Sequence, residues 1–577
     1  MARKGLSLSE ALKVLEELPS DSESESADSS DTEVYTPEPI LQYESDDASA
    51  VDEDISDEDD LSQPGTSTQP QIPTWISKQR LQKTLPDFSS ISGPSEKFWE
   101  LPEKSPIEIF QEIFSIELME HIVFETNLYA TQSSKQFSPL TIAELYIFLG
   151  INMLMGIKRM PSYTDYWANE EAFRDPFISR HMSRNRFAWI LGNLHLNNNV
   201  LQPKRGEANF DRLYKVRPFL DHLSKSFLDA LHPGQYQSID ESMIKFKGRS
   251  SIKQYMPKKP IKRGFKVWMR CDESGYACEF EIYSGKKEVV EKNLGENVVK
   301  RLTERLHGKH HHVFMDNYFT TYELFRYLET KQIYACGTVM LNRKNLPHHL
   351  LSLDKELKRG NYDWAVSSDN LICLKWKDKR CVTILSSLPD AVDRIEIQRK
   401  EKDGKKVNVN CPKAISTYNA NMGFVDKFDQ LISLYEIDRK SKKWWHRIFF
   451  HFVDAAVINS YILHKMLTGN EIKTAKEFRL NLIYSLCAMK ESETTTLKKR
   501  LPSNPDDAPP FKVKVSADKR FSNVEHMPVK STSRRCAYCS TKQKPRRTSF
   551  ACKSCNVGLC FFQKGVTCFQ KYHESKK

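Results

Sequence analysis

The chain has 577 residues and a formal net charge of +11. This length predicts several domains, because one domain commonly takes about 150 residues. A mean hydropathy of −0.56 together with 28% charged residues argues against a membrane protein, so we expect a soluble one. The charge is uneven: residues 1–60 hold 20 acidic and 3 basic side chains, a net of −17, so the remainder carries +28. Such a basic body favours a polyanionic partner, above all nucleic acid.

Two features bear on the compartment. The longest apolar run, Ile142–Ile157, has 16 residues, fewer than the roughly 20 that span a bilayer, so we expect a buried helix there. The N-terminus has no apolar segment followed by a small-residue cleavage site, so we expect no secretory signal. In the reducing compartment that this implies, the six cysteines between Cys536 and Cys568 indicate metal binding rather than disulfides.

The two ends of the chain differ from its middle in composition. Residues 1–97 are rich in Ser, Asp, Glu and Pro and cannot bury enough apolar surface to fold, so we expect a disordered acidic tail. Its role stays open between a solvating tail without a partner and an autoinhibitory arm or kinase target. Over residues 98–231 apolar residues recur at helical spacing, and helices return over 433–500. We expect these two segments to form one helical dimerisation and DNA-binding region.

Between the helical segments the spacing predicts strands and helices in the order βββαβαβ. The predicted elements are strands over 237–246, 264–270 and 276–283, a helix over 286–306, a strand over 311–315, a helix over 322–329 and a strand over 333–338. This order is that of an RNase H-like nuclease, so we expect a mixed α/β catalytic core over 232–338 and 414–432. Short alternating strands predict a β-rich insertion domain over 339–413. A linker over 501–525 precedes a cysteine-rich end over 526–577.

Acidic side chains stand where such a core binds metal. Asp240 lies on the first predicted strand and Asp316 ends the fourth, and these strands are neighbours in this fold type. Asp426 and Asp429, at i and i+3 on a helix predicted over 416–434, share one helix face. Carboxylates suit two Mg²⁺ or Mn²⁺ ions, which activate the attacking oxygen and stabilise the leaving oxygen. A lone Asp at such a position is usually solvated or capping, so the combination carries the prediction.

Three blocks of sequence resemble the catalytic blocks of piggyBac-type DNA transposases, in the order and spacing of that family. They are residues 240–249 (DESMIKFKGR), 314–320 (FMDNYFT) and 421–430 (NMGFVDKFDQ). The resemblance runs over residues 107–573. It implies that Asp240, Asp316 and Asp426 form the catalytic triad and that Asp429 is a fourth acidic residue near the metals. Because all four positions keep Asp, we expect an active enzyme.

The same resemblance implies a function. A transposase of this type nicks each transposon end, joins the freed 3′ hydroxyl to the opposite strand as a hairpin, and inserts the opened end at a TTAA target in double-stranded DNA. Two protomers pair as a homodimer, because two ends are cut together. Two other functions stay open: a domesticated DNA-binding or chromatin protein that kept the fold, and a nuclease that cleaves without joining strands.

Two basic segments with interleaved aromatic residues predict contact with DNA phosphates and bases. The first, for which a solvated hairpin face is the alternative, contains Lys253, Lys258, Lys259, Lys262, Arg263 and Lys266. The second contains Arg439, Lys440, Lys442 and Lys443, followed by two tryptophans. Adjacent tryptophans cannot both face one core, so we expect one in the core and the other stacked on an exposed base. The resemblance assigns the stacking to Trp444.

The C-terminal end reads CxxC-x12-CxxC-x4-C-x7-C-x4-H, a spacing typical of structural zinc sites. Two tetrahedral sites of a cross-brace zinc domain need eight ligands, and this run supplies Cys536, Cys539, Cys552, Cys555, Cys560, Cys568 and His573. His526 is the candidate for the eighth; without it, one site takes a water or one ion binds alone. Four basic residues in this segment predict a surface that contacts DNA phosphates: Arg534, Arg535, Arg546 and Arg547. The alternative is a purely structural or protein-binding role. The same basic residues suit a nuclear localisation signal, so we expect a nuclear protein.

Overall fold

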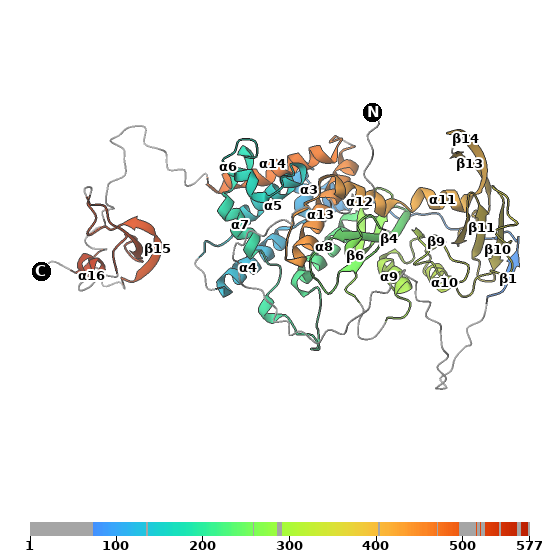
Figure 1. The fold of residues 1–577 in the computed structure, drawn as a ribbon, viewed down its shortest axis with the longest axis horizontal. Helices are drawn as coiled ribbons and strands as arrows, with labels where there is room; N and C mark the ends of the chain where they lie inside the picture. Colours follow the sequence, from blue (N-terminus) through green and yellow to red (C-terminus); the bar gives the residue numbers. More distant parts are fainter. Residues whose placement is uncertain are drawn as a thin grey trace, which may run out of the picture. The chain divides into compact units, whose positions relative to one another are not determined.

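The fold is known from a computed structural model of the full chain (Figure 1). The structure describes residues 73–133, 137–257, 259–285, 291–401, 404–469, 471–494, 515, 520, 526–541, 544–561 and 567–574. Residues 1–72 of the predicted acidic tail lie outside the described residues. So does the predicted linker over 501–525, apart from residues 515 and 520.

A mixed sheet of ten strands is the centre of the described chain. Its middle consists of β4 (Tyr236–Lys245), β6 (Arg263–Asp272), β7 (Ala277–Ile282), β8 (His312–Met315) and β9 (Tyr334–Thr338), and α9 (Leu294–Leu302) and α10 (Tyr322–Thr330) connect the later strands. The elements follow the predicted order βββαβαβ. β4 pairs antiparallel with β6 and parallel with β8, which pairs parallel with β9. The two helices are the crossovers that parallel neighbours require.

The region predicted as an insertion extends this sheet. β10 (Tyr362–Ser367), β11 (Ile372–Lys377) and β12 (Cys381–Ser386) form a meander, and β12 pairs antiparallel with β9. β13 (Arg394–Lys400) and β14 (Lys406–Pro412) form a hairpin apart from the large sheet. The predicted strands are confirmed, but most of them are not a separate module. The reason is that β9 offers an open edge whose backbone groups need partners, and β12 supplies them.

Part of the stretch predicted as tail joins the folded body. β1 (Trp75–Ser77) pairs antiparallel with β10, and Trp75 Nε1 donates a hydrogen bond of 2.9 Å to the carbonyl of Asn345. β2 (Gly93–Pro94) pairs with β3 (Leu231–His232), and α2 (Glu96–Trp99) follows. The tail boundary predicted after residue 97 is therefore too late. A short segment with few apolar residues gains order when it pairs with an existing sheet edge, which composition does not reveal.

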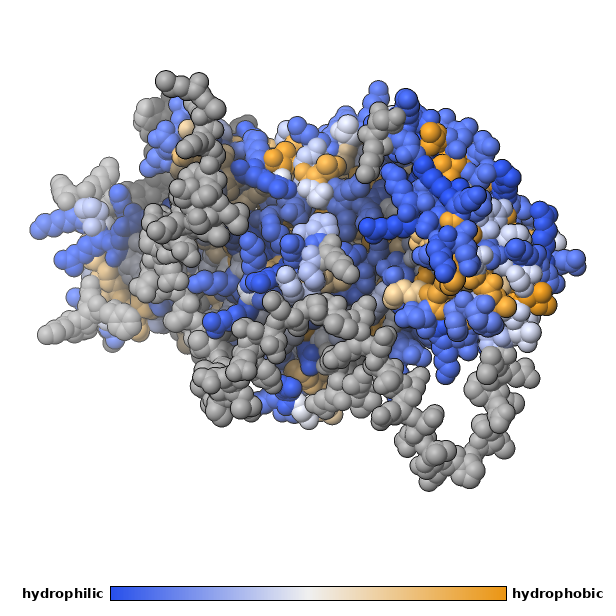
Figure 2. Space-filling view, turned by 45° about the vertical axis from the view of Figure 1, so that its right-hand side comes forward, coloured by the Kyte–Doolittle hydropathy of each residue, from blue (hydrophilic) through white to orange (hydrophobic). Residues whose placement is uncertain are grey.

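Helices gather beside β4 and β6 (Figure 1). They are α3 (Pro106–Ile113), α4 (Ile116–Gln132), α5 (Ile142–Ile157), α6 (Pro176–His181), α7 (Arg184–Asn193), α8 (Arg217–Ala230), α13 (Trp444–Thr468) and α14 (Ala475–Thr494), with 3-10 turns at Tyr163–Trp167, Asn199–Leu201 and Tyr214–Val216; a further 3-10 turn, Glu304–Leu306, follows α9. α5 has the predicted ends, and Thr141 and Glu144 form a capping box at its start. No helix in the described ranges is long and apolar enough to cross a bilayer. The face drawn in Figure 2 is mostly hydrophilic, with hydrophobic residues in smaller groups.

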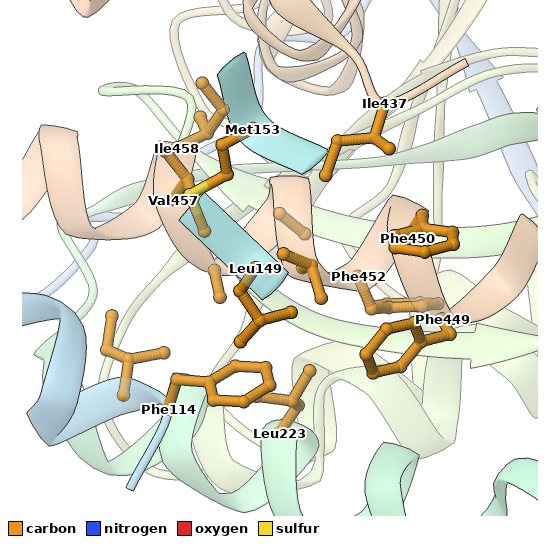
Figure 3. Close-up of a cluster of buried hydrophobic side chains, with 14 of the residues drawn as sticks. Phe114, Leu149, Met153, Leu223, Ile437, Phe449, Phe450, Phe452, Val457 and Ile458 are labelled. Atoms are coloured by element: carbon orange, nitrogen blue, oxygen red, sulfur yellow. The ribbon is translucent and has the colours of Figure 1, made fainter. Parts of the chain in front are cut away.

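The helices share a hydrophobic core with one face of the sheet. Phe114, Leu149 and Phe449 meet there from the end of α3, from α5 and from α13 (Figure 3), and Phe265 of β6 belongs to the same cluster. A second cluster, which includes Trp268 of β6, packs α9 and α10 against the opposite face. β4 and β6 are therefore held between two cores, which fixes the position of any side chain they carry.

Two helices stand where one was predicted over 416–434. α11 (Lys413–Asn421) and α12 (Phe424–Tyr435) are separated at Gly423, and glycine is among the poorest helix formers. α12 packs on β4 and β6. α5 approaches its end so closely that a Cβ on Gly156 would meet the carbonyl oxygen of Tyr435 at 2.3 Å. This close approach helps to position α12, which carries two of the predicted acidic residues.

Candidate active site

The two strand aspartates meet where β8 ends. In the parallel pair of β4 and β8, Ile239 is the partner of Met315, so the following residues, Asp240 and Asp316, lie side by side. One carboxyl oxygen each of Asp240, Asp316 and Glu241 lies within 4.8 Å of the others. Oxygen ligands this close together suit a hard divalent cation. We call these three side chains the carboxylate group.

Glu241 is a member of the carboxylate group that sequence reasoning missed. Consecutive residues of a strand point to opposite faces, so the neighbour of Asp240 is expected to turn away from it. The Glu241 side chain is only 6% exposed, and its Oε1 lies 2.8 Å from Nζ of Lys266 on the paired strand β6. An acidic residue on one predicted strand and a lysine on the next were the available signal. This signal predicts an ion pair only when the register of β4 with β6 is known, because that register sets Glu241 opposite Trp268, two positions from Lys266.

Burial raises the pKa of the two strand aspartates of this group. The pKa of Asp240 rises to about 7, chiefly through loss of contact with water, and the nearby charge of Asp316 raises it further, while Lys259 opposes the rise. The pKa of Asp316 is also raised, first by burial and then by the charge of Glu241. Carboxylates in such surroundings favour a proton or a cation, which relieves their repulsion. The carboxylate group is therefore disposed to accept positive charge.

The two helix aspartates lie at a neighbouring cavity. Asp426 and Asp429 of α12 line a hollow of about 410 Å³ together with Glu241. Asp429 Oδ1 accepts a hydrogen bond of 2.7 Å from Ser242 Oγ, which ties α12 to β4, and burial raises the pKa of Asp429 to about 6. Among the residues that the structure describes, neither helix aspartate lies within the 4.8 Å that joins the carboxylate group. The structure thus brings the strand aspartates together and places the helix pair in the wall of the adjoining cavity.

The C-terminal module contains two clusters of Cys and His. Its elements are β15 (Pro528–Arg535), β16 (Arg547–Cys552) and α16 (Cys568–His573). Ligand atoms lie within 4.8 Å of one another in each cluster; one consists of His526, Cys552, Cys555 and His573, and the other of Cys536, Cys539, Cys560 and Cys568. The clusters take their members from interleaved segments of the chain. Two sets of four such ligands are compatible with two zinc ions.

His526 completes the first cluster. Its Nδ1 lies 3.3 Å from Cys552 Sγ and 3.5 Å from Cys555 Sγ. Its ring stacks on that of His573, with the ring centroids 4.2 Å apart. The geometry therefore favours four protein ligands in this cluster over three protein ligands and a water.

Comparisons with known proteins identify one family along most of the chain. The family described as Transposase IS4 matches residues 105–461. PiggyBac transposable element-derived protein 3 of Homo sapiens is 29% identical over 501 residues, which are 85% of this chain and 79% of that protein. This chain belongs to the piggyBac transposable element-derived family. Residues 105–461 are an IS4-type DDE transposase domain.

Two further comparisons agree with this assignment. PiggyBac transposable element-derived protein 2 of Homo sapiens is 28% identical over 504 residues, covering 84% of this chain and 81% of that protein. The cryo-EM structure of a piggyBac transposase synaptic complex with hairpin DNA is similar with a TM-score of 0.62 and 25% identity. That match covers 81% of this chain and 97% of the other. The mixed sheet and its helices are therefore the fold of a piggyBac transposase.

Two basic residues predicted to contact DNA have partners for their charged groups within the protein. Lys266 is 9% exposed and pairs with Glu241. Arg439 donates a hydrogen bond of 2.6 Å to Asn152 Oδ1 and lies over the ring of Phe187, and burial lowers its pKa to about 10. Lys266 is buried, whereas Arg439 is partly exposed. Contact of either side chain with DNA stays a prediction.

Other basic residues keep their predicted role open. Exposed side chains are those of Lys262, Arg263, Lys440, Lys442, Arg535, Arg546 and Arg547. Three others make contacts within the protein through backbone or side-chain oxygens: Lys253 with Gly248, Lys443 with Gly192, and Arg534 with Asn556. Lys258 lies outside the described residues. Contact of these residues with DNA stays a prediction.

The two adjacent tryptophans divide between core and surface. Trp445 is 3% exposed and belongs to the large helical core. Trp444 is half-buried at the start of α13, with its ring 6.2 Å from that of Phe265, edge to face. The predicted core position of one tryptophan is therefore confirmed. Stacking of Trp444 on a DNA base stays a prediction.

Proposed function

We propose that this family member is an active cut-and-paste DNA transposase that cleaves and joins DNA strands at the carboxylate group. The observation that carries the proposal is the meeting of Asp240, Glu241 and Asp316 within 4.8 Å in a chain with a DDE transposase domain. Asp at positions 426 and 429 adds support, since both line the adjoining cavity. The reaction proposed is excision through hairpin ends followed by insertion at TTAA targets.

The sheet supports an RNase H-like core. Its middle strands run in the order β7, β6, β4, β8, β9, with β6 antiparallel and β8 parallel to β4. In this arrangement the two central parallel strands carry Asp240 and Asp316. A nuclease core of this kind needs acidic residues on these neighbouring strands, because each divalent cation takes oxygens from more than one of them.

The residues fit a pair of Mg²⁺ or Mn²⁺ ions. The carboxylate group offers oxygen ligands only, and burial raises the pKa of Asp240 and Asp316, so that both gain from a cation. Asp426 and Asp429 add two carboxylates in the lining of the adjoining cavity. Two bound ions would activate the attacking oxygen and stabilise the leaving oxygen of a phosphoryl transfer.

The protein's own contribution is a rigid frame for these oxygens. Asp240 and Asp316 are held by paired strands buried between two cores, Lys266 orients Glu241, and Ser242 orients Asp429. Nicking, hairpin formation and joining are each a phosphoryl transfer, so one fixed site serves all of them. A frame that needs no rearrangement between steps lowers the cost of each transition state.

The partners follow from the related complex and from surface charge. A similar transposase has been determined as a synaptic complex with hairpin DNA, and we extend this assembly to two copies of the present chain holding two transposon ends. The C-terminal clusters are proposed to hold two zinc ions. Exposed Arg535, Arg546 and Arg547 in that module are proposed to face DNA phosphates and to serve import into the nucleus.

An excision and integration assay tests the proposal. Cells receive a reporter bounded by candidate terminal repeats together with wild type, Asp316→Ala or Asp229→Ala, an exposed aspartate of α8 that serves as the matched control. We expect wild type and Asp229→Ala to excise the reporter and restore an intact TTAA, and Asp316→Ala to do neither. Binding of the repeats without excision by wild type would instead favour a DNA-binding protein that kept the fold. The human relatives are named as proteins derived from a transposable element, which is the observation that favours this second function.

A further inference from the structure

Lys259 inserts its ammonium group into the carboxylate group. It lies in the loop between β5 (Gln254–Tyr255) and β6. Its Nζ is 3.5 Å from Asp240 Oδ1 and 3.5 Å from Glu241 Oε2. It also donates a hydrogen bond of 3.2 Å to the backbone carbonyl of Glu241. One positive charge thus touches two of the three carboxylates that are proposed to bind metal.

The second lysine at this site is held differently. Lys266 projects from β6, binds the other carboxyl oxygen of Glu241 and has its ammonium 4.5 Å from the ring centre of Tyr318 and 5.2 Å from that of Trp268. Its side chain is 11% exposed, against 29% for Lys259. Lys266 is therefore fixed by a strand and two rings, whereas Lys259 depends on a loop and on the carboxylates. Of the two, Lys259 is the one that can move away without disrupting the sheet.

We propose that Lys259 competes with the divalent cation for Asp240 and Glu241, so that metal enters the site by displacing its ammonium group. This inference rests on the proposed function. A divalent ion and an ammonium group a few ångströms apart repel each other strongly in a partly buried site, so they cannot share the same carboxylate oxygens at full strength. Lys259 is thus a positioning residue that sets the affinity of the site for metal.

DNA gives the displaced lysine a new partner. A phosphate of the bound strand next to the carboxylate group attracts the ammonium group and stabilises the metal-bound arrangement. Metal and DNA then support each other's binding, and the coupling is reciprocal because it is a property of binding free energies. In the absence of DNA the metal therefore binds weakly.

Mn²⁺ binding to the full chain tests the inference without reference to activity. The free Mn²⁺ signal in electron paramagnetic resonance measures affinity for wild type, Lys259→Met, Lys259→Gln and Lys259→Arg, each with and without a short DNA duplex. Lys262→Met is the matched control, because Lys262 lies in the same loop and is exposed. Asp316→Ala identifies the Mn²⁺ that binds at the carboxylate group. Thermal unfolding of each variant shows that it is folded.

Without DNA, we expect Lys259→Met and Lys259→Gln to bind Mn²⁺ about tenfold more tightly than wild type, equivalent to about 1.4 kcal/mol. Lys259→Arg and Lys262→Met should bind like wild type, and DNA should tighten binding by wild type but not by the charge-free variants. Equal or weaker Mn²⁺ binding by a folded charge-free variant overturns the inference. Absence of any Asp316-dependent Mn²⁺ binding in wild type, even with DNA, refutes the proposed function itself.

Discussion

We expect Asp240 to make the wild-type protein less stable at neutral pH than a variant with Asn at this position. In the folded chain the pKa of Asp240 is raised from its ordinary 3.8 to about 7, mainly by burial. Below pH 3.8 the carboxyl group is protonated in both the folded and the unfolded chain, so it costs nothing. As the pH rises towards 7, the unfolded chain releases this proton while the folded chain retains it, and the folded state loses relative stability.

The size of the effect follows from the two pKa values. Each tenfold difference in proton affinity corresponds to about 1.36 kcal/mol, so a rise from 3.8 to about 7 corresponds to about 4 kcal/mol at most. Asp240→Asn keeps the shape and removes the charge. We therefore expect the variant to gain stability over wild type between about pH 4 and about pH 7, with no further gain above that.

Denaturant unfolding in buffer free of Mg²⁺ and Mn²⁺ measures this difference. Wild type and Asp240→Asn are compared at about pH 5 and about pH 8, and the free energy of unfolding should favour the variant more at the higher value. Added Mg²⁺ should stabilise wild type and leave the variant unchanged, because the variant lacks a ligand. A difference in stability that is the same at both pH values, or a variant that is less stable than wild type at the higher one, would refute the reasoning.

Three other predictions follow from buried contacts and from the C-terminal clusters. Asp454→Ala leaves Arg479 without its partner at 2.7 Å in the interior, so unfolding should become easier by about 3 to 5 kcal/mol in urea titrations; a cost below about 1 kcal/mol would contradict this. His526→Ala should reduce the zinc content of the purified chain from two ions to one in elemental analysis, whereas an unchanged content would exclude this histidine as a ligand. Trp444→Ala should fold normally but weaken binding of single-stranded transposon ends by about 1 to 3 kcal/mol in fluorescence titrations, and unaltered binding would remove the stacking role.

The sequence determined those features that depend on local pattern. The apolar run over 142–157 was enough to predict α5 with both ends, and alternation with turns predicted the order of strands and helices around Asp240 and Asp316. These predictions succeed because the pattern of apolar residues along the chain reports which part of an element is buried. The spacing of the cysteines likewise predicted the residues that form the two C-terminal clusters, since metal sites draw on short motifs.

Contacts between segments distant in the chain were decided by the tertiary structure. The division of the Cys and His residues into two interleaved clusters is one example, because spacing alone permits several pairings. β1 is another: its place at the sheet edge depends on a free edge of β10, which no local pattern in a polar stretch reveals.

The carboxylate group shows the same limit at the site itself. Asp240 and Asp316 were predicted from strand positions, but Glu241 entered through the register of β4 with β6, which brings Lys266 beside it. Lys259 was assigned to DNA because it lies in a basic segment with interleaved aromatic residues, and only the path of its loop brings it to the carboxylates. Local sequence determined which strands carry the acidic residues. Tertiary packing decided which charges neutralise them, because a buried charge selects its partner by distance in space rather than by distance along the chain.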